Sequence, residues 1–235
     1  MERKKDWYMN FLFLLAFIGF SNVLTGQVNF CYFKETYAAG NMDGWEKEIR
    51  KIEGQHSQNF EVMANTLTAR YGYMGYLLGK KENSKVRSLL DETEKLLEGW
   101  LKKQPGNSRL LGIKAGLVGF RIGISPMRAP FLGQRNLDAY EEAIKNNPSE
   151  PMGWLEKGNS MFHRPSMFGG DKTEAENAFR KALQLAKADD CDWLYSFLQV
   201  RLYEACKANG KTAEAEAIKK QLQQKPGHFR WIDSL

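Results

Sequence analysis

Cysteine and histidine are scarce in this chain of 235 residues, which contains three of each. None of the cysteines has the C-x-x-C spacing of a zinc site or a dithiol redox motif. The histidines are scattered along the chain, and neither H-E-x-x-H nor G-x-S-x-G occurs. The sequence therefore predicts no metal site, no cofactor and no catalytic centre, so we expect a protein that is not an enzyme.

The three cysteines are Cys31, Cys191 and Cys206. The last two are expected on one helix, where fifteen residues correspond to roughly 22 Å, too far for a disulfide. Any bridge must then start at Cys31. We expect free, buried thiols, with a single bridge from Cys31 as the alternative.

The chain also lacks an apolar run of the roughly 20 residues that a comfortable membrane-spanning helix needs. Its apolar segment near the start, Phe11 to Phe20, follows the basic residues Arg3, Lys4 and Lys5. This pattern predicts an export signal over residues 1–26. The alternative is an uncleaved anchor in the inner membrane, formed by residues 11–24. In either case we expect an exported protein, periplasmic in a Gram-negative source.

The charge balance does not indicate a nucleic-acid-binding protein, although the formal net charge is +6. Acidic and basic residues alternate, as in Glu46-Lys47-Glu48, and such runs form solvated helix faces. Hydrophobic residues make up 43% of the chain and charged residues 26%, which is ordinary for a soluble globular protein. We expect no nucleic-acid partner.

Residues 147–186 have the pattern of two helices joined by a loop. The first helix carries Trp154 and, four residues later, Gly158, while the second carries Ala175, Phe179 and Ala182. Small residues let two helix backbones approach closely, and the aromatic ring fills the space beside the crossing. The alternative is a generic amphipathic hairpin.

A large residue followed by a small one on the first helix, and then Ala, Phe and Ala on the second, is an order that resembles the tetratricopeptide repeat family. The resemblance implies an all-α solenoid of about four helical hairpins with irregular caps at both ends. It divides the chain into an N-terminal helical cap over 27–57, repeats over 58–228 and a C-terminal tail over 229–235. It also implies a non-catalytic scaffold that binds another envelope protein or peptide.

Similar units lie on both sides of the central hairpin. Helices are expected over 45–53, 59–79, 86–102, 108–124 and 136–145, with a last hairpin over 191–226. Asp43 is expected to cap the helix over 45–53. The tail carries Phe229 and Trp231, which are expected to fold back over the last helix pair. Glu176 is expected on the outer, solvated face of its helix.

Two connections are longer than the repeat requires. Pro105 and Pro148 lie 43 positions apart, against a usual period of about 34 residues, and the surplus falls in the connection over 125–135. A second surplus falls over 164–171. Because consecutive repeats stack in parallel, we expect the two connections side by side on one edge.

We predict two binding surfaces. One is the concave groove around Asn159 and Phe162. The other is formed by the long connections, whose exposed apolar side chains next to positive charge are typical of binding hot spots. Its residues are Met127, Arg128, Phe131, Arg164, Met167 and Phe168. The alternative is that the two connections pack on each other and extend the core.

The segment Gly169-Gly170-Asp171 allows two interpretations. The glycines permit a sharp turn and Asp171 caps the next helix. Alternatively, the helix N-terminus forms an anion site with Arg164 or Lys172. This segment resembles exported repeat proteins that accompany tripartite ATP-independent periplasmic transporters. That resemblance implies our alternative function, a small-ligand or anion-binding periplasmic protein associated with a transporter.

Overall fold

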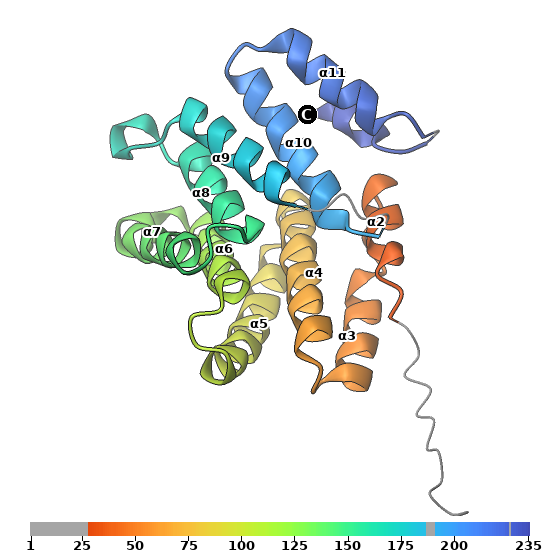
Figure 1. Ribbon diagram of the computed structural model, residues 1–235, viewed down its shortest axis with the longest axis vertical. Coiled ribbons are helices and arrows are strands. Elements are labelled where there is room, and N and C mark those ends of the chain that lie inside the picture. The colour runs from red at the N-terminus through yellow and green to blue at the C-terminus, as the bar shows by residue number, and fades with distance from the viewer. Residues whose placement is uncertain (1–27, 187–190, 226) are drawn as a thin grey trace, which may run out of the picture.

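A computed structural model describes residues 28–186, 191–225 and 227–235 of the chain. Within these ranges every regular element is a helix and no strand occurs, which confirms the all-α prediction (Figure 1). The predicted export signal and anchor lie outside the described residues. None of the described helices is both long and apolar enough to span a membrane. The elements are α2 (Cys31–Ala38), α3 (Trp45–His56), α4 (Phe60–Gly79), α5 (Asn83–Lys103), α6 (Ser108–Ile124), η1 (Pro126–Arg128), α7 (Ala129–Asn146), α8 (Pro151–His163), η2 (Ser166–Phe168), α9 (Lys172–Leu185), α10 (Trp193–Ala208), α11 (Thr212–Leu222) and η3 (Arg230–Ser234).

Side-chain caps define where several of these helices begin. The side chain of Asn59 accepts a hydrogen bond from Val62 N at the start of α4, and Asn107 does the same for Leu110 N in α6. Asp43 does not cap α3 as expected, because Gly44 occupies the N-cap position. The Asp43 carboxylate instead accepts hydrogen bonds from Lys80 Nζ, just after α4, at 2.8 Å and from Tyr76 OH on α4 at 2.9 Å.

The helices form antiparallel hairpins that stack on one another. α4 packs on α5, α6 on α7, α8 on α9 and α10 on α11. The first helices of successive hairpins also touch, α4 against α6 and α6 against α8. Gly112 permits the second of these contacts, because a Cβ there would lie 2.9 Å from the backbone carbon of Met152. The successive hairpins thereby form one curved stack (Figure 1).

The hairpin of α6 and α7 differs from the prediction in its second helix. α7 begins at Ala129 rather than near residue 136, so most of the predicted connection is helical. Pro130 lies in the first turn of α7, where its missing N–H and fixed φ are compatible with a helix. Phe131 is therefore a residue of the first turn of α7, while Met127 and Arg128 belong to the short helix η1.

The stack curves far enough to bring the two ends of the described chain together. α10 packs against α2, so the orange and blue ends of the ribbon lie side by side in Figure 1. Phe229 N donates a hydrogen bond to Ala38 O at 2.6 Å, and Trp231 Nε1 donates to Tyr37 O at 3.2 Å. The tail thus contacts α2 as well as the last helix pair. Its contact with that pair is a hydrogen bond that Gln223 Nε2 donates to Phe229 O.

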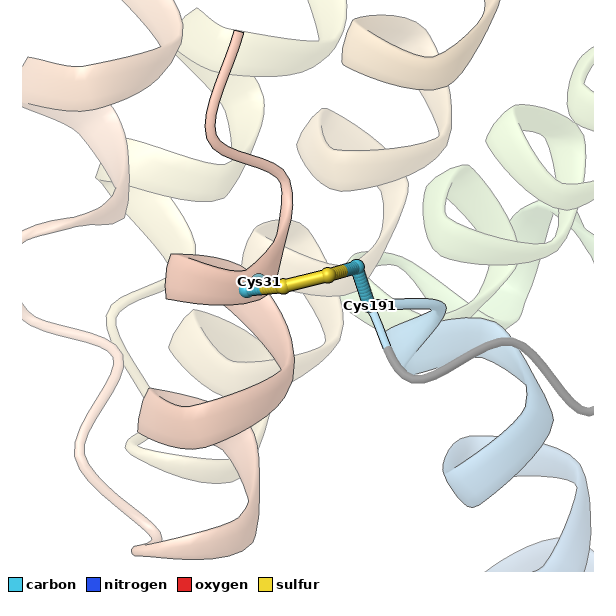
Figure 2. The surroundings of a disulfide bond; sticks show 2 residues. All are labelled: Cys31 and Cys191. Atoms are coloured by element: carbon cyan, nitrogen blue, oxygen red, sulfur yellow. A yellow bond between two sulfur atoms is a disulfide. The ribbon is translucent and has the colours of Figure 1, made fainter.

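A disulfide joins Cys31 and Cys191 across this closure, as Figure 2 shows. The expectation of free thiols is therefore wrong for these two residues. Cys191 does not lie on a helix with Cys206, because α10 begins at Trp193. The curvature of the stack then places Cys191 next to the first residue of α2. Cys206 remains a free, buried thiol.

Candidate binding surfaces

Four large apolar side chains stand out from the two predicted connections. Met127 is 89% exposed, Phe131 80%, Met167 82% and Phe168 65%. We call these four residues the apolar loop residues. In the described part of the chain, one other large hydrophobic side chain is exposed to a comparable degree, Leu235 at 47%. The connections do not bury these side chains against each other, so the alternative that they extend the core is wrong.

Local backbone geometry explains why Met167 and Phe168 are presented to solvent. η2 is followed by Gly169, which has a left-handed φ of 86°. A Cβ at Gly170 would lie 1.8 Å from the carbonyl oxygen of Arg164, so only glycine fits this turn. Asp171 then caps α9 by accepting hydrogen bonds from Thr173 N and Glu174 N, at 2.7 Å and 3.1 Å.

The cap confirms the structural interpretation of the Gly-Gly-Asp segment. The carboxylate of Asp171 already occupies the N-terminus of α9, where it would repel an anion. Of the two arginines in the predicted surface, Arg128 is exposed. Arg164 is half-buried, and its Nη2 donates a hydrogen bond to Ser160 Oγ at 2.8 Å. Its side chain also forms a hydrogen bond with that of Tyr140 on α7. Arg164 therefore links the second connection to α7.

Asn159 and Phe162 are half-buried rather than open to a groove. The amide of Asn159 donates to Tyr71 OH at 2.9 Å and to Glu156 Oε1 at 3.2 Å. Phe162 lies with its ring centroid 6.4 Å from that of Phe179. The donors of Asn159 are thus used within the protein, and its assignment as a partner-binding residue stays a prediction.

Glu156 is a buried carboxyl group that the sequence analysis did not single out. It is 3% exposed and accepts hydrogen bonds from Asn159 and Tyr71. Burial raises the pKa of Glu156 to about 7, against the opposing effects of these hydrogen bonds and of Arg201. No sequence pattern distinguishes this residue, since Glu156-Lys157 resembles the charged pairs of solvated helix faces.

Arg201 on α10 is a second buried charge that the sequence analysis missed. The residue is 9% exposed, and its Nη1 donates to a carboxylate oxygen of Glu204. Its Nη2 lies 3.0 Å from His163 Nε2 at the end of α8. The signal was available in the sequence, because Arg201 interrupts the apolar residues Val200 and Leu202.

A third buried group surrounds Glu176, which is 1% exposed and so does not lie on an outer face as expected. Oxygen and sulfur atoms of Glu176, Cys206 and Glu214 lie within 4.8 Å of one another. Arg180 and Lys211 contact the Glu176 carboxylate at 2.7 Å, so cationic side chains already neutralise it. Burial alone would raise the pKa of Glu176, but hydrogen bonds from Lys211, Asn209 and Arg180 lower this pKa to about 2. The arrangement is that of an ion-pair network joining α9 to α10 and α11.

Comparison with known proteins shows the fold alone. No protein-family model matches the chain. No curated protein matches it either. Among solved structures, the chain is similar to the HusA haemophore from Porphyromonas gingivalis, with a TM-score of 0.60 and 14% sequence identity. The match covers 77% of this chain and 91% of the haemophore, so most of the helical architecture is shared.

Proposed function

We propose that this chain is a non-catalytic helical-repeat scaffold of the bacterial cell envelope, which holds a protein partner on the apolar loop residues. The observation that carries the proposal is the exposure of these four side chains, from 65% to 89%, since Leu235 at 47% is the one other exposed large apolar side chain among the described residues. Exposed Phe and Met next to arginine are typical of protein-binding hot spots. The tetratricopeptide-like order of Trp154, Gly158 and Phe179 supports the same class of protein.

Export is part of the proposal. Disulfides persist in oxidising compartments such as the bacterial periplasm and the cell surface, and Cys31 and Cys191 form one. The basic and apolar residues near the start of the sequence have the order of an export signal. The structural neighbour is named as a haemophore, and its helical architecture is compatible with a protein of this class.

Photo-crosslinking in the source cells tests the scaffold. A photoreactive amino acid is placed at position 168 in one variant and at position 131 in another. Both variants should give an adduct with the same protein. The same probe at Asn177, which is exposed on α9, should give none. Adducts that differ between positions 168 and 131, or that also form at Asn177, would contradict one defined partner surface.

Binding of an iron porphyrin is a second candidate function, favoured by two exposed thioethers. Met127 and Met167 are both strongly exposed, and thioethers are known axial ligands of haem iron. The structural neighbour is named as a haemophore. Titration of the protein with haemin should then shift its Soret absorbance, and the double variant Met127→Leu plus Met167→Leu should abolish the shift. An unchanged titration in the variant would remove this candidate.

A further inference from the structure

A buried arginine with an unused donor lies where α8, α9 and α10 meet. Arg201 donates to Glu204 from Nη1, while its Nη2 lies 3.0 Å from His163 Nε2. Its Nε is buried and has no hydrogen-bond partner among the described residues. Buried polar groups in proteins are normally paired, so an unpaired donor on a charged group needs an explanation. A ligand that supplies an acceptor is one such explanation.

A second cation lies against the same aromatic ring as Arg201. Lys172 Nζ is 3.6 Å from the ring centroid of Phe162, and Arg201 Cζ is 5.1 Å from it. Lys172 is exposed, and it donates to the carbonyl oxygen of Phe162. Within the described part of the chain, Glu204 is the one carboxylate in contact with either cation. Glu156 also interacts electrostatically with Arg201, but burial raises the pKa of Glu156 to about 7, so near neutral pH its charge offsets Arg201 only in part. Positive charge is therefore in excess at this point.

His163 shows how this excess acts on a neighbouring group. An arginine side chain has donors but no acceptor, so in this contact His163 Nε2 must accept and the imidazole must be neutral. Burial, Arg201 and Lys172 together lower the pKa of His163 to about 4. Residue 163 as a whole is exposed at the end of α8, but its ring is shielded from water where it lies against Arg201 and Phe162, so an anion that displaces the ring gains access to Arg201.

We propose that Arg201 and Lys172 bind a carboxylate or a phosphate, one oxygen of which accepts from the unpaired Nε of Arg201 while another replaces His163 Nε2 as the acceptor from Nη2. A charged oxygen is a stronger acceptor than a neutral imidazole, and it compensates both cations at once. Lys172 provides the contact with solvent through which the anion enters. This site shares no residue with the apolar loop residues, so it goes beyond the proposed scaffold and can fail or succeed independently.

The test uses the imidazole of His163 as a reporter. The protein is titrated with succinate and separately with inorganic phosphate, each against sodium chloride at constant ionic strength, while the His163 resonances are followed by NMR. A His163→Gln variant assigns those resonances among the three histidines. We expect a saturable shift and a higher pKa of His163 when the anion is bound. Saturation by succinate alone identifies a carboxylate site, and saturation by phosphate alone identifies a phosphate site.

Lys172→Met and Lys207→Met form a matched pair of variants. Both lysines are exposed and both lie over an aromatic ring, Lys207 at 5.4 Å from the centroid of Tyr203. Lys172→Met should weaken anion binding at least tenfold, and Lys207→Met should leave it unchanged. The proposal is overturned by the absence of saturation with both anions, or by equal affinities of the two variants. Since Lys172 is exposed, its variant should fold even where an Arg201 variant does not.

Discussion

The ring of Phe179 fills the space that a side chain at Gly158 would need. A Cβ at position 158 would lie 2.4 Å from Cε1 of Phe179, which is far closer than real Cβ contacts. Gly158 is on α8 and Phe179 on α9, so this contact sets how closely the two helices of the hairpin approach. Both residues are fully or nearly fully buried.

The first prediction follows from this contact. Gly158→Ala should lower the free energy of unfolding by about 1–3 kcal/mol, because it overpacks a filled interface. Gly99→Ala is the matched control, since Gly99 is a helical glycine where an added Cβ would meet no atom within 4 Å. That substitution should raise stability by roughly 0.5–1 kcal/mol. Urea unfolding followed by circular dichroism measures both, and equal effects would contradict the packing argument.

The second prediction concerns the Cys31–Cys191 bridge, which joins residues separated by 160 positions. Replacing both cysteines by serine should lower the free energy of unfolding by about 2–5 kcal/mol, because the closed loop is long. In the unreduced, denatured protein a thiol titration should find one free thiol per chain, that of Cys206.

Cys206→Ala serves as the control for the bridge. This variant should remain sensitive to a reducing agent, whereas the double serine variant should not. Finding three free thiols per chain before reduction would show that the bridge does not form in solution.

The third prediction concerns pH and Glu156. Its pKa in the folded protein is raised to about 7, above the value of a solvated glutamate. The folded state therefore binds more protons than the unfolded state between the two pKa values. Stability should fall as the pH rises from about 4.5 to 7, by roughly 1–3 kcal/mol in total.

Glu156→Gln should remove that dependence on pH. The glutamine keeps an acceptor for Asn159 and Tyr71 but carries no charge to desolvate. At pH 8 the variant should be more stable than the natural protein, and at pH 4 the difference should nearly vanish. The test is the urea midpoint of both proteins, measured between pH 4 and pH 8. Parallel pH profiles of the two proteins would contradict the assignment of this pH dependence to Glu156.

Helix positions can largely be predicted from the sequence because their signals are local. The expected helix over 108–124 has its observed bounds, since Asn107 supplies a cap and apolar residues continue to Ile124. The early start of α7 is not predicted, because Pro126 and Pro130 suggest a loop. Proline is also compatible with a first helical turn, and packing on α6 decides between the two.

Features that depend on the curvature of the whole stack could not be predicted. The disulfide requires α2 and the start of α10 to meet, and no local pattern reports that meeting. The burial of Glu156 depends on distant elements too, because Tyr71 of α4 lies against it. Arg201, however, has a local signal in its apolar neighbours Val200 and Leu202. The exposure of Phe168, by contrast, follows from the Gly-Gly-Asp turn beside it, and its role in partner binding stays a prediction.

The most direct test of the scaffold is the affinity of the crosslinked partner for a double variant, Phe131→Ser plus Phe168→Ser. The control is Leu235→Ser, which changes the other exposed large apolar side chain in the described part of the chain. We predict at least a tenfold loss of affinity, about 1.4 kcal/mol, for the double variant and none for the control, with the free energy of unfolding unchanged in both. An unchanged affinity of the double variant would contradict the account.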